Sequence, residues 1–304
     1  MLAGVRFESV LRCRLCAAPR ARMNTWLRDV EDLDGSLEVF TLLKCSSCGL
    51  VQTDPYPSES TIASLYRGGV SSDYEFPEAS AVGRVKEFVS RRQVRRLRQS
   101  IRFPKTVLDF GTGAGRYAAA AATVFPSARV YGTDFNVHPP AGSYYEHAIN
   151  RLTYLSYAQL PDSGMQFDLI VARHVLEHMH HPVAMLEAWL KLLAPSGVLY
   201  IEVPNAGSRT GKLVGGRWPL WYVPKHLSHF DQGTLRRAIE QAGGRSEIGR
   251  TEMPMMGNVL ALLSGKSRSD KRFQIPGAVL FPLQKALETG RGAGSCLYAF
   301  VRNI

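Results

Sequence analysis

Four of the five cysteines stand in two short pairs, Cys13 with Cys16 and Cys45 with Cys48, each pair separated by two residues. This spacing lets both thiolates of a pair face one ion, and two pairs supply the four ligands of a structural zinc site. In a reducing compartment such pairs favour a metal over disulfides. Because four thiolates leave no open position on Zn²⁺, we expect the metal to stabilise a small domain and to do no chemistry.

A second group of residues lies in the string VLDFGTGAGRY, where Gly111, Gly113 and Gly115 separate an apolar run from an alanine-rich stretch. Glycine permits a sharp turn and lets a ligand lie against the main chain. Asp134 stands about twenty residues further on, after the next apolar run, where a carboxylate can accept hydrogen bonds from two ribose hydroxyls. The order strand, glycines, helix, strand and acid predicts a nucleotide-binding site.

The type of nucleotide follows from the glycine spacing and from Asp109, which precedes Gly111 by two positions. Dinucleotide sites use GxGxxG, and no Walker lysine follows these glycines. A carboxylate is unfavourable beside a pyrophosphate but favourable beside the cationic amino-acid portion of S-adenosylmethionine. These residues therefore favour S-adenosylmethionine as the ligand.

The elements that would position these residues alternate in type from Lys105 onward. Short apolar runs separated by helical stretches are typical of a parallel α/β sheet. Strands are predicted over TVLDFG, RVYGTDF, LTYLS, FDLIVA, VLYIEV and CLYAFV. Helices are predicted after the glycines, from Pro182 to Leu193 and over DQGTLRRAIEQAGG.

Four motifs in order, DFGTGAGRY, YGTDFN, FDLIVARHVLEHMHHP and LLAPSGVLYIEVPN, resemble the successive motifs of class I S-adenosylmethionine-dependent methyltransferases. PKHLSHFDQGTLRRAIEQAGG is similar to a segment of many bacterial members, in which a histidine-bearing loop enters a helix. The resemblance implies a Rossmann-like α/β fold with a seven-stranded sheet, in which CLYAFV is the antiparallel strand near the edge. The cysteine region resembles the zinc ribbon that precedes this fold in bacterial enzymes of polysaccharide or natural-product pathways.

Three regions are expected on this basis: a zinc ribbon at 1–55 with a strand over LEVFTLL, a helical linker region at 56–104, and the methyltransferase domain at 105–304. In the linker region, one helix is predicted near SESTIASLY and another from about Glu78 to Arg102. Residues 253–295 are apolar and broken by prolines, which suits either a lid or a partner surface.

The resemblance also implies a set of cofactor contacts: Asp109, Phe110, Gly111, Thr112, Gly113, Gly115, Asp134, Phe135 and His174. Many relatives place an aspartate before a Leu-Pro pair to hold the adenine amino group. Here YLSYAQLP offers only Ser156 or Gln159, so the adenine contact stays unassigned.

Methyl transfer to an oxygen would benefit from a general base, and His178, His226 and His229 are the candidates. The alternative for each is a histidine that orders a loop or hydrogen-bonds to the backbone. Nearby Trp218, Trp221 and Tyr222 either line the acceptor pocket or only pack. The string from His174 to His178 also fits the HxxEH pattern of zinc proteases, but it follows a strand where that pattern needs a helix.

The composition points to an anionic partner, because lysine and arginine exceed the acids by a net charge of +11. A four-thiolate zinc site would lower this to about +9. We expect a small-molecule acceptor, anionic or phosphorylated, such as a sugar-derived, polysaccharide or natural-product intermediate. The alternatives are an RNA methyltransferase, favoured by the basic helix RVKEFVSRRQVRRLRQSIR, and a non-catalytic cofactor-binding module.

No apolar run reaches the about 18 residues that a membrane span needs. The N-terminal stretch MLAGVRFESVLRCRLC lacks the apolar segment of a signal peptide. These observations predict a cytoplasmic protein and leave the oligomeric state open.

Overall fold

The centre of the molecule is a seven-stranded sheet in the order β12-β13-β10-β9-β6-β7-β8. The computed structural model describes residues 4–32, 38–65, 77–147, 151–160, 163–265, 271–289 and 293–304. The strands are β6 (Thr106–Phe110), β7 (Arg129–Asp134), β8 (Leu152–Ser156), β9 (Phe167–Arg173), β10 (Leu193–Pro204), β12 (Gly244–Thr251) and β13 (Cys296–Asn303). β13 runs antiparallel to both neighbours, while β8, β7, β6, β9 and β10 are parallel. The Rossmann-like prediction is confirmed, including the antiparallel CLYAFV strand.

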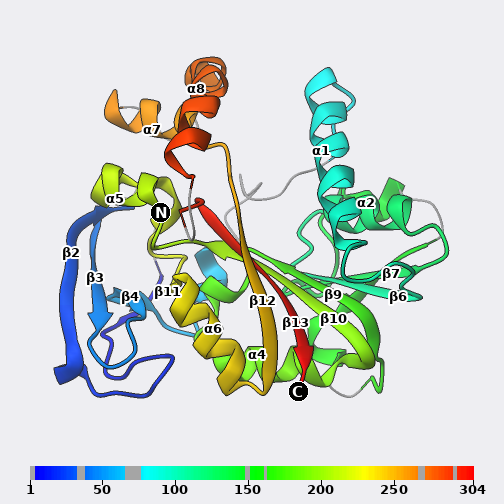
Figure 1. Cartoon of the computed structure of the whole chain (residues 1–304), viewed down its shortest axis with the longest axis horizontal. Coiled ribbons are helices and arrows are strands. Elements are labelled where there is room, and N and C mark those ends of the chain that lie inside the picture. Colours follow the sequence, from blue (N-terminus) through cyan, green and yellow to red (C-terminus); the bar gives the residue numbers. More distant parts are fainter. Residues whose placement is uncertain are drawn as a thin grey trace.

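Helices cover both faces of this sheet (Figure 1). On one face, α1 (Ala81–Leu97) packs with α2 (Arg116–Val124); on the other lie α4 (Pro182–Lys191) and α6 (Gln232–Gln241). Side chains alternate between the faces along each strand. Val107 packs in the core of α1 and α2, while Leu108 packs in the core of α4 and α6. The carboxyl ends of the parallel strands therefore meet at one edge, where ligands of such sheets bind.

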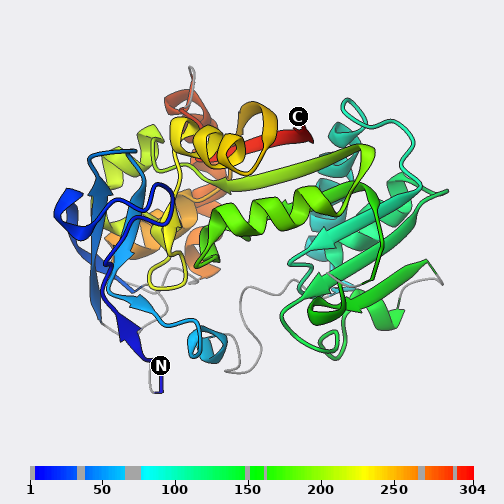
Figure 2. The ribbon, with the colours of Figure 1, turned by 90° about the horizontal axis from the view of Figure 1, so that it is seen from below.

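The cysteine region forms a second, four-stranded sheet in the order β11-β4-β3-β2. Its strands are β2 (Met23–Glu31), β3 (Val39–Cys45), β4 (Val51–Asp54) and β11 (Ser228–His229), while β1 (Phe7–Glu8) pairs with β5 (Tyr56–Pro57). β11 comes from a distant part of the sequence and lies beside β4 (Figure 2). Trp218 and Trp221, both fully buried, pack on one face of this sheet. The small sheet thus shares its core with the segment that follows β10.

The remaining helices lie around these two sheets. They are α3 (Tyr144–His147), α5 (Arg209–Val214), α7 (Met256–Leu263), α8 (Gln274–Leu287) and 3-10 turns at Arg20–Arg22, Ile62–Leu65, Tyr157–Gln159, Leu176–His178, Gly215–Arg217, Pro219–Trp221 and Lys271–Phe273. α7 and α8 pack against each other, and α8 exposes Ile275 and Val279. Within the described ranges, no helix has both the length and the apolar character that a membrane crossing requires.

Some sequence-based boundaries differ from the structure. SESTIASLY contains a 3-10 turn at Ile62–Leu65 where a longer helix was predicted, and residues 66–76 lie outside the described ranges. The helix predicted from Glu78 to Arg102 is shorter, because Ser80 caps it by accepting a hydrogen bond from the Gly83 amide. β12 was not predicted, because GRSEIGRT is a polar edge strand with little apolar signal.

Candidate functional site: a cofactor loop and a cysteine cluster

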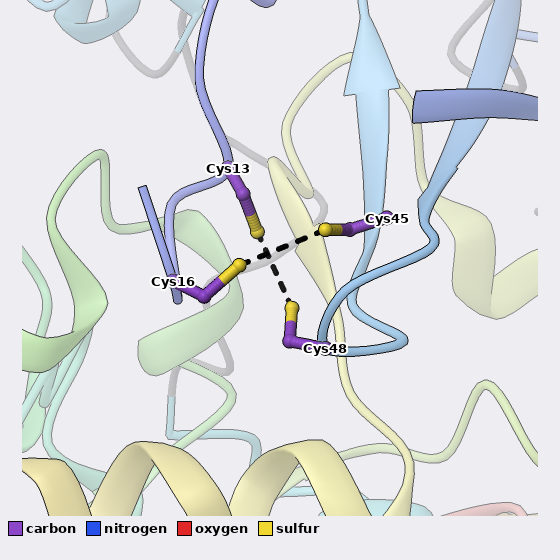
Figure 3. Close-up of side chains that lie close together, drawn as sticks. All are labelled: Cys13, Cys16, Cys45 and Cys48. Atoms are coloured by element: carbon purple, nitrogen blue, oxygen red, sulfur yellow. Dashed lines mark hydrogen bonds between the residues drawn. The ribbon is translucent and has the colours of Figure 1, made fainter. Parts of the chain in front are cut away.

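The four paired cysteines converge on one point (Figure 3). The Sγ atoms of Cys13 and Cys48 are 3.4 Å apart, and those of Cys16 and Cys45 are 3.7 Å apart. All four sulfurs lie within 4.8 Å of one another. A tetrahedral Zn²⁺ with bonds of about 2.3 Å separates its ligand sulfurs by about 3.8 Å. The donor set and its spacing therefore fit a closed four-thiolate zinc site.

The two knuckles have the same backbone design. In the first, the Ala17 amide donates to the Cys13 carbonyl at 2.9 Å; in the second, the Gly49 amide donates to the Cys45 carbonyl at 2.9 Å. The residue after each second cysteine is left-handed, with φ of 56° at Ala17 and 88° at Gly49. Glycine adopts this conformation freely, whereas alanine does so at an energetic cost.

We expect Ala17→Gly to stabilise the protein by about 0.5–1 kcal/mol. Relief of left-handed strain contributes about 1–2 kcal/mol, and the greater freedom of glycine in the unfolded chain offsets about half of it. The measurement is a denaturant titration of the zinc-loaded protein. Ala18→Gly serves as a control that should not stabilise, since Ala18 is not among the residues with positive φ.

The glycine loop connects β6 to α2 through three left-handed glycines, with φ of 74° at Gly111, 53° at Gly113 and 88° at Gly115. A Cβ atom at Gly111 would overlap Val175, so only glycine fits there. The amides of Gly111 and Thr112 donate to the Thr133 carbonyl at 2.8 and 3.0 Å. These bonds tie the loop to the end of β7, as a ligand-binding turn at the carboxyl edge requires.

The two predicted acids lie on either side of this loop. Asp134 accepts hydrogen bonds from the Gly113 amide at 2.9 Å and from the Phe135 amide at 2.8 Å, one at each carboxylate oxygen. Each oxygen has a second lone pair, which leaves acceptor capacity for a hydroxyl. Asp109 is 4% exposed and accepts the Thr112 hydroxyl at 2.8 Å. Burial raises the pKa of Asp109 to about 6, although Thr112 and Arg173 act in the opposite direction.

The glycine loop has one neighbour that the sequence did not predict, Tyr145 of α3. Its hydroxyl lies 2.8 Å from the Thr112 hydroxyl, and the same hydroxyl oxygen would overlap a Cβ atom at Gly132. A Cβ at Gly115 would come within 2.6 Å of the tyrosine ring. Tyr145 therefore lies against the turn that follows β6. No local pattern marks this tyrosine, because the chain reaches it through the crossover between β7 and β8.

The aromatic members of the predicted cofactor set differ in environment. The Phe110 ring is buried, with Trp189 at 5.1 Å and Tyr157 at 5.6 Å, so it belongs to the core. Phe135 is 59% exposed and packs its ring on Tyr157 at 5.4 Å. Phe135 is thus the aromatic side chain of the set that is accessible beside Asp134.

His174 lies at the end of β9 with a left-handed φ of 52°, and its amide donates to the Glu202 carbonyl at 2.8 Å. Its Nδ1 faces Glu177 Oε1 at 3.3 Å, and its Nε2 faces Glu202 Oε1 at 3.4 Å. Burial lowers the pKa of His174, but these two carboxylates outweigh it and raise the pKa to about 9. The imidazolium is therefore held between two acids, which the sequence did not predict.

The three candidate bases gather where β9 ends and β11 begins. The rings of His178 and His226 are 4.6 Å apart, and those of His226 and His229 are 6.4 Å apart. His226 and His229 are 4% and 3% exposed, whereas His178 is partly exposed. Burial raises the pKa of Asp134, while the Gly113 and Phe135 amides and, more weakly, the charge of His178 act in the opposite direction. Of the three, His178 is therefore accessible and near the cofactor loop.

Each histidine also holds a polar partner. Nδ1 of His178 and Nδ1 of His226 lie 3.0 and 2.9 Å from the carbonyls of Lys225 and Leu220, and Nε2 of His229 lies 2.9 Å from the Thr53 hydroxyl. A nitrogen that faces a carbonyl carries the proton, so Nε2 of His178 and of His226 is the basic nitrogen when the ring is neutral. Burial, with the charge of Arg14, lowers the pKa of His229 to about 3.

Known proteins resemble this chain in sequence and in fold. A family model described as a methyltransferase domain matches residues 84–245, more than half of the chain. The ubiquinone biosynthesis O-methyltransferase of Haemophilus ducreyi is 28% identical over 142 residues, which cover 43% of this chain and 59% of that protein. A methyltransferase of Strobilurus tenacellus is 31% identical over 162 residues, which cover 50% of this chain and 58% of that protein.

Among solved structures, a similar fold occurs in the 1,6-didemethyltoxoflavin-N1-methyltransferase of Burkholderia thailandensis, bound to 1,6-didemethyltoxoflavin and S-adenosylhomocysteine. The TM-score is 0.51 at 17% identity, over 84% of this chain and 95% of that one. At this identity the likeness concerns the fold alone. The matched regions of both curated relatives cover less than two thirds of those proteins.

Proposed function

The chain belongs to the family of methyltransferase domains, and from this premise we propose that it transfers a methyl group from S-adenosylmethionine to a small molecule. One observation carries the proposal. Asp134 is fixed by the Gly113 and Phe135 amides at the end of β7, directly beside three left-handed glycines. Class I methyltransferases need an acid and an open loop backbone at this place, and the residues present fit the cofactor.

We assign distinct roles to the loop residues. Asp134 accepts the ribose hydroxyls, the glycines allow the cofactor to lie against the main chain, and Asp109 attracts the ammonium group of its amino-acid portion. Phe135 offers an exposed ring beside the ribose acid. When bound, S-adenosylmethionine supplies an electrophilic methyl group on a sulfonium. The chain contributes mainly alignment, because displacement at that carbon proceeds in line.

For an oxygen acceptor, we assign the general base to His178. Its Nδ1 faces the Lys225 carbonyl, so Nε2 is the nitrogen that takes up a proton. Buried His226 and His229 position the loop after Tyr222, since they hold the Leu220 carbonyl and the Thr53 hydroxyl. Thr53 also donates to the His226 carbonyl at 2.7 Å, which joins this loop to β4.

The pKa of Asp109 predicts how cofactor affinity depends on pH. Because burial raises this pKa to about 6, the carboxylate is ionised at neutral pH and protonated in mild acid. We expect the affinity for S-adenosylmethionine to fall about tenfold between pH 7.5 and pH 5, as the ionised fraction falls. In the free protein, the raised pKa of Asp109 also contributes to folding stability. This contribution is fully present below the ordinary pKa of an aspartate and is lost as the pH rises through about 6.

Calorimetry at a series of pH values checks this expectation. Asp109→Asn should bind more weakly at pH 7.5 and lose the pH dependence, because the amide keeps an acceptor for Thr112 but carries no charge. A wild-type affinity that stays constant down to pH 5 would contradict the role of Asp109.

We further propose that the acceptor is an anionic sugar-derived, polysaccharide or natural-product intermediate. Small-molecule acceptors are supported by the relatives, whose names concern ubiquinone biosynthesis and a toxoflavin precursor. We keep 1–55 as the zinc ribbon, 56–104 as the linker region and 105–304 as the methyltransferase domain. The pairing of β4 with β11, and the core that Cys45 and Leu50 share with Phe230, support a ribbon that works as part of the acceptor site.

RNA is the second candidate acceptor, because α1 is rich in arginine. Its last turns are buried through Val94 and Leu97, while Val85, Phe88 and Val89 nearer its start are exposed. An exposed strip of apolar and basic side chains remains compatible with RNA contacts. Filter binding of labelled total RNA tests this candidate: salt-sensitive micromolar binding would favour it, and its absence at physiological salt would exclude it.

The cofactor part of the proposal is tested by titrating S-adenosylmethionine and S-adenosylhomocysteine into the zinc-loaded protein. We expect one competitive site per chain for both compounds. A protein that binds neither compound would contradict the proposal. Binding of both without transfer to any acceptor would instead favour the non-catalytic module.

A further inference from the structure

A groove of about 1440 Å³ lies between the first cysteine knuckle and the start of α4. Most residues between Glu8 and Ala17 and between Tyr56 and Ser60 line it, together with His180, His181, Val183 and Gln241, and the lining includes the carboxylates of Glu8 and Glu59. The groove includes neither the glycine loop nor the three candidate bases. One of its lining residues, Arg14, follows Cys13 directly in the sequence, so the zinc knuckle fixes the backbone of this arginine.

The Arg14 side chain is held in place by its surroundings. Its amide donates to Gln52 Oε1 at 2.8 Å, and its Nη1 donates to the same oxygen at 3.4 Å. Its guanidinium carbon lies 4.0 Å from the centre of the Tyr56 ring, which packs edge-on against His180 at 5.8 Å. The amide oxygen and the aromatic face orient the guanidinium, while Cys13, Asp54 and Glu8 act on its charge at longer range.

Among the residues that the structure describes, no carboxylate oxygen lies within the 4.0 Å ion-pair distance of Arg14. Three acids line the groove or lie beside it, and each has another partner: Glu59, in the wall, faces His181 at 3.9 Å. Asp54 accepts the Val10 amide at 2.8 Å and pairs with Arg20 at 3.7 Å, and Glu8 accepts the Tyr56 hydroxyl at 3.2 Å. A fixed guanidinium that has no carboxylate at ion-pair distance suits a phosphate or a carboxylate, both of which match its donor fork.

Two short stretches of chain connect the residues around the groove with those of the proposed acceptor site. Gln52, which holds Arg14, is next in β4 to Thr53, which holds His229. His180, in the wall of the groove, follows the proposed base His178 by two residues and is fixed by its contact with the Pro57 carbonyl at 2.8 Å. In addition to burial, the charge of Arg14 lowers the pKa of His229 and of His180, so Arg14 lies within electrostatic range of both rings.

We propose that Arg14 binds an oxyanion of the acceptor, a phosphate or a carboxylate, and that the zinc knuckle thereby orients the acceptor for methyl transfer. This inference rests on the proposed function and adds a residue and a ligand chemistry to it. It also assigns a purpose to the cysteine cluster beyond stability, because the metal fixes the loop that presents the guanidinium.

The test is calorimetric titration of the zinc-loaded protein with inorganic pyrophosphate and, separately, with citrate. We expect saturable binding of at least one of them, weakened at least tenfold in Arg14→Gln. Arg14→Lys should be intermediate, because lysine keeps the charge but loses the fork and the stacking on Tyr56. Arg22→Gln is the matched control: it removes the same charge from an exposed side chain of the same region and should change affinity less than twofold.

S-adenosylmethionine binding and zinc content are measured on the same samples. Arg14→Gln should keep the wild-type cofactor affinity, since Arg14 lies outside the glycine loop. If Arg14→Gln loses zinc, Arg14→Lys is used in its place. We then expect Arg14→Lys to bind the anions at least threefold more weakly than the wild type does. Two results would overturn this inference alone, provided that the wild type binds the cofactor. The wild type binds neither anion, or it binds the anions no more tightly than Arg14→Gln does. A wild type that does not bind the cofactor overturns the proposed function as well.

Discussion

Asp134→Ala is expected to weaken S-adenosylmethionine binding by about 100-fold or more. The carboxylate accepts the Gly113 and Phe135 amides at 2.9 and 2.8 Å, and its remaining lone pairs are the proposed acceptors for the ribose hydroxyls. Two hydrogen bonds to a charged group contribute about 1.5–3 kcal/mol each, and about 2.7 kcal/mol corresponds to 100-fold in affinity. Alanine also frees the Gly113 amide, so the glycine loop loses an anchor. Calorimetric titration of the cofactor measures the effect.

Asp134→Asn removes the charge of this side chain but keeps its size and shape. The amide keeps one acceptor oxygen, so we expect a smaller loss, about tenfold. Thermal unfolding without ligand controls for damage to the fold, because the variant loop stays tied to the Thr133 carbonyl. If Asp134→Ala bound the cofactor within threefold of the wild type, Asp134 would not be the ribose acid.

Cys48→Ser is expected to abolish stoichiometric zinc binding and to destabilise the chain by more than about 4 kcal/mol, as loss of a structural metal does. Cys13 and Cys45 are 4% and 1% exposed, so their thiolates would be left buried without a cation. The loss should extend beyond the knuckles, because Cys45 and Phe230 share one hydrophobic core. Metal analysis and a denaturant titration measure the two effects.

Cys296→Ala is the matched control for this prediction. Cys296 is fully buried in β13, apart from the four-sulfur cluster to which the partly buried Cys48 belongs. This variant should keep one zinc per chain and lose only the modest stability of a small core truncation. A Cys48→Ser protein with full zinc content and an unchanged unfolding midpoint would show that the four cysteines do not form one metal site.

The sequence predicts most of the sheet because its buried strands are short apolar runs between helices. FDLIVA and CLYAFV are short, mostly apolar runs, a pattern that predicts buried strands. β12 cannot be predicted in this way. Its edge position tolerates charged residues such as Arg245 and Glu247, and these interrupt the alternation of apolar and polar residues that would mark a strand. β11 cannot be predicted either, because a two-residue strand gains its partner β4 only through the tertiary fold.

The cofactor loop is predictable for a physical reason: its glycines and acids follow strands at fixed offsets along the chain. Tyr145 and Arg14 are not, since each reaches its neighbours through a crossover or a metal knuckle that leaves no periodic signal. The sequence marks His178, His226 and His229 as a group. Their partners are main-chain carbonyls and one hydroxyl, which no residue pattern encodes.

The most direct measurement of the central claim is transfer of a labelled methyl group from S-adenosylmethionine. Zinc-loaded protein is incubated with the labelled cofactor and, separately, with a small-metabolite extract and with total RNA; Asp134→Ala serves as the inactive control. The account predicts label in the metabolite fraction with wild type and none with Asp134→Ala. Label that enters RNA, or no label in either fraction despite cofactor binding, would contradict it.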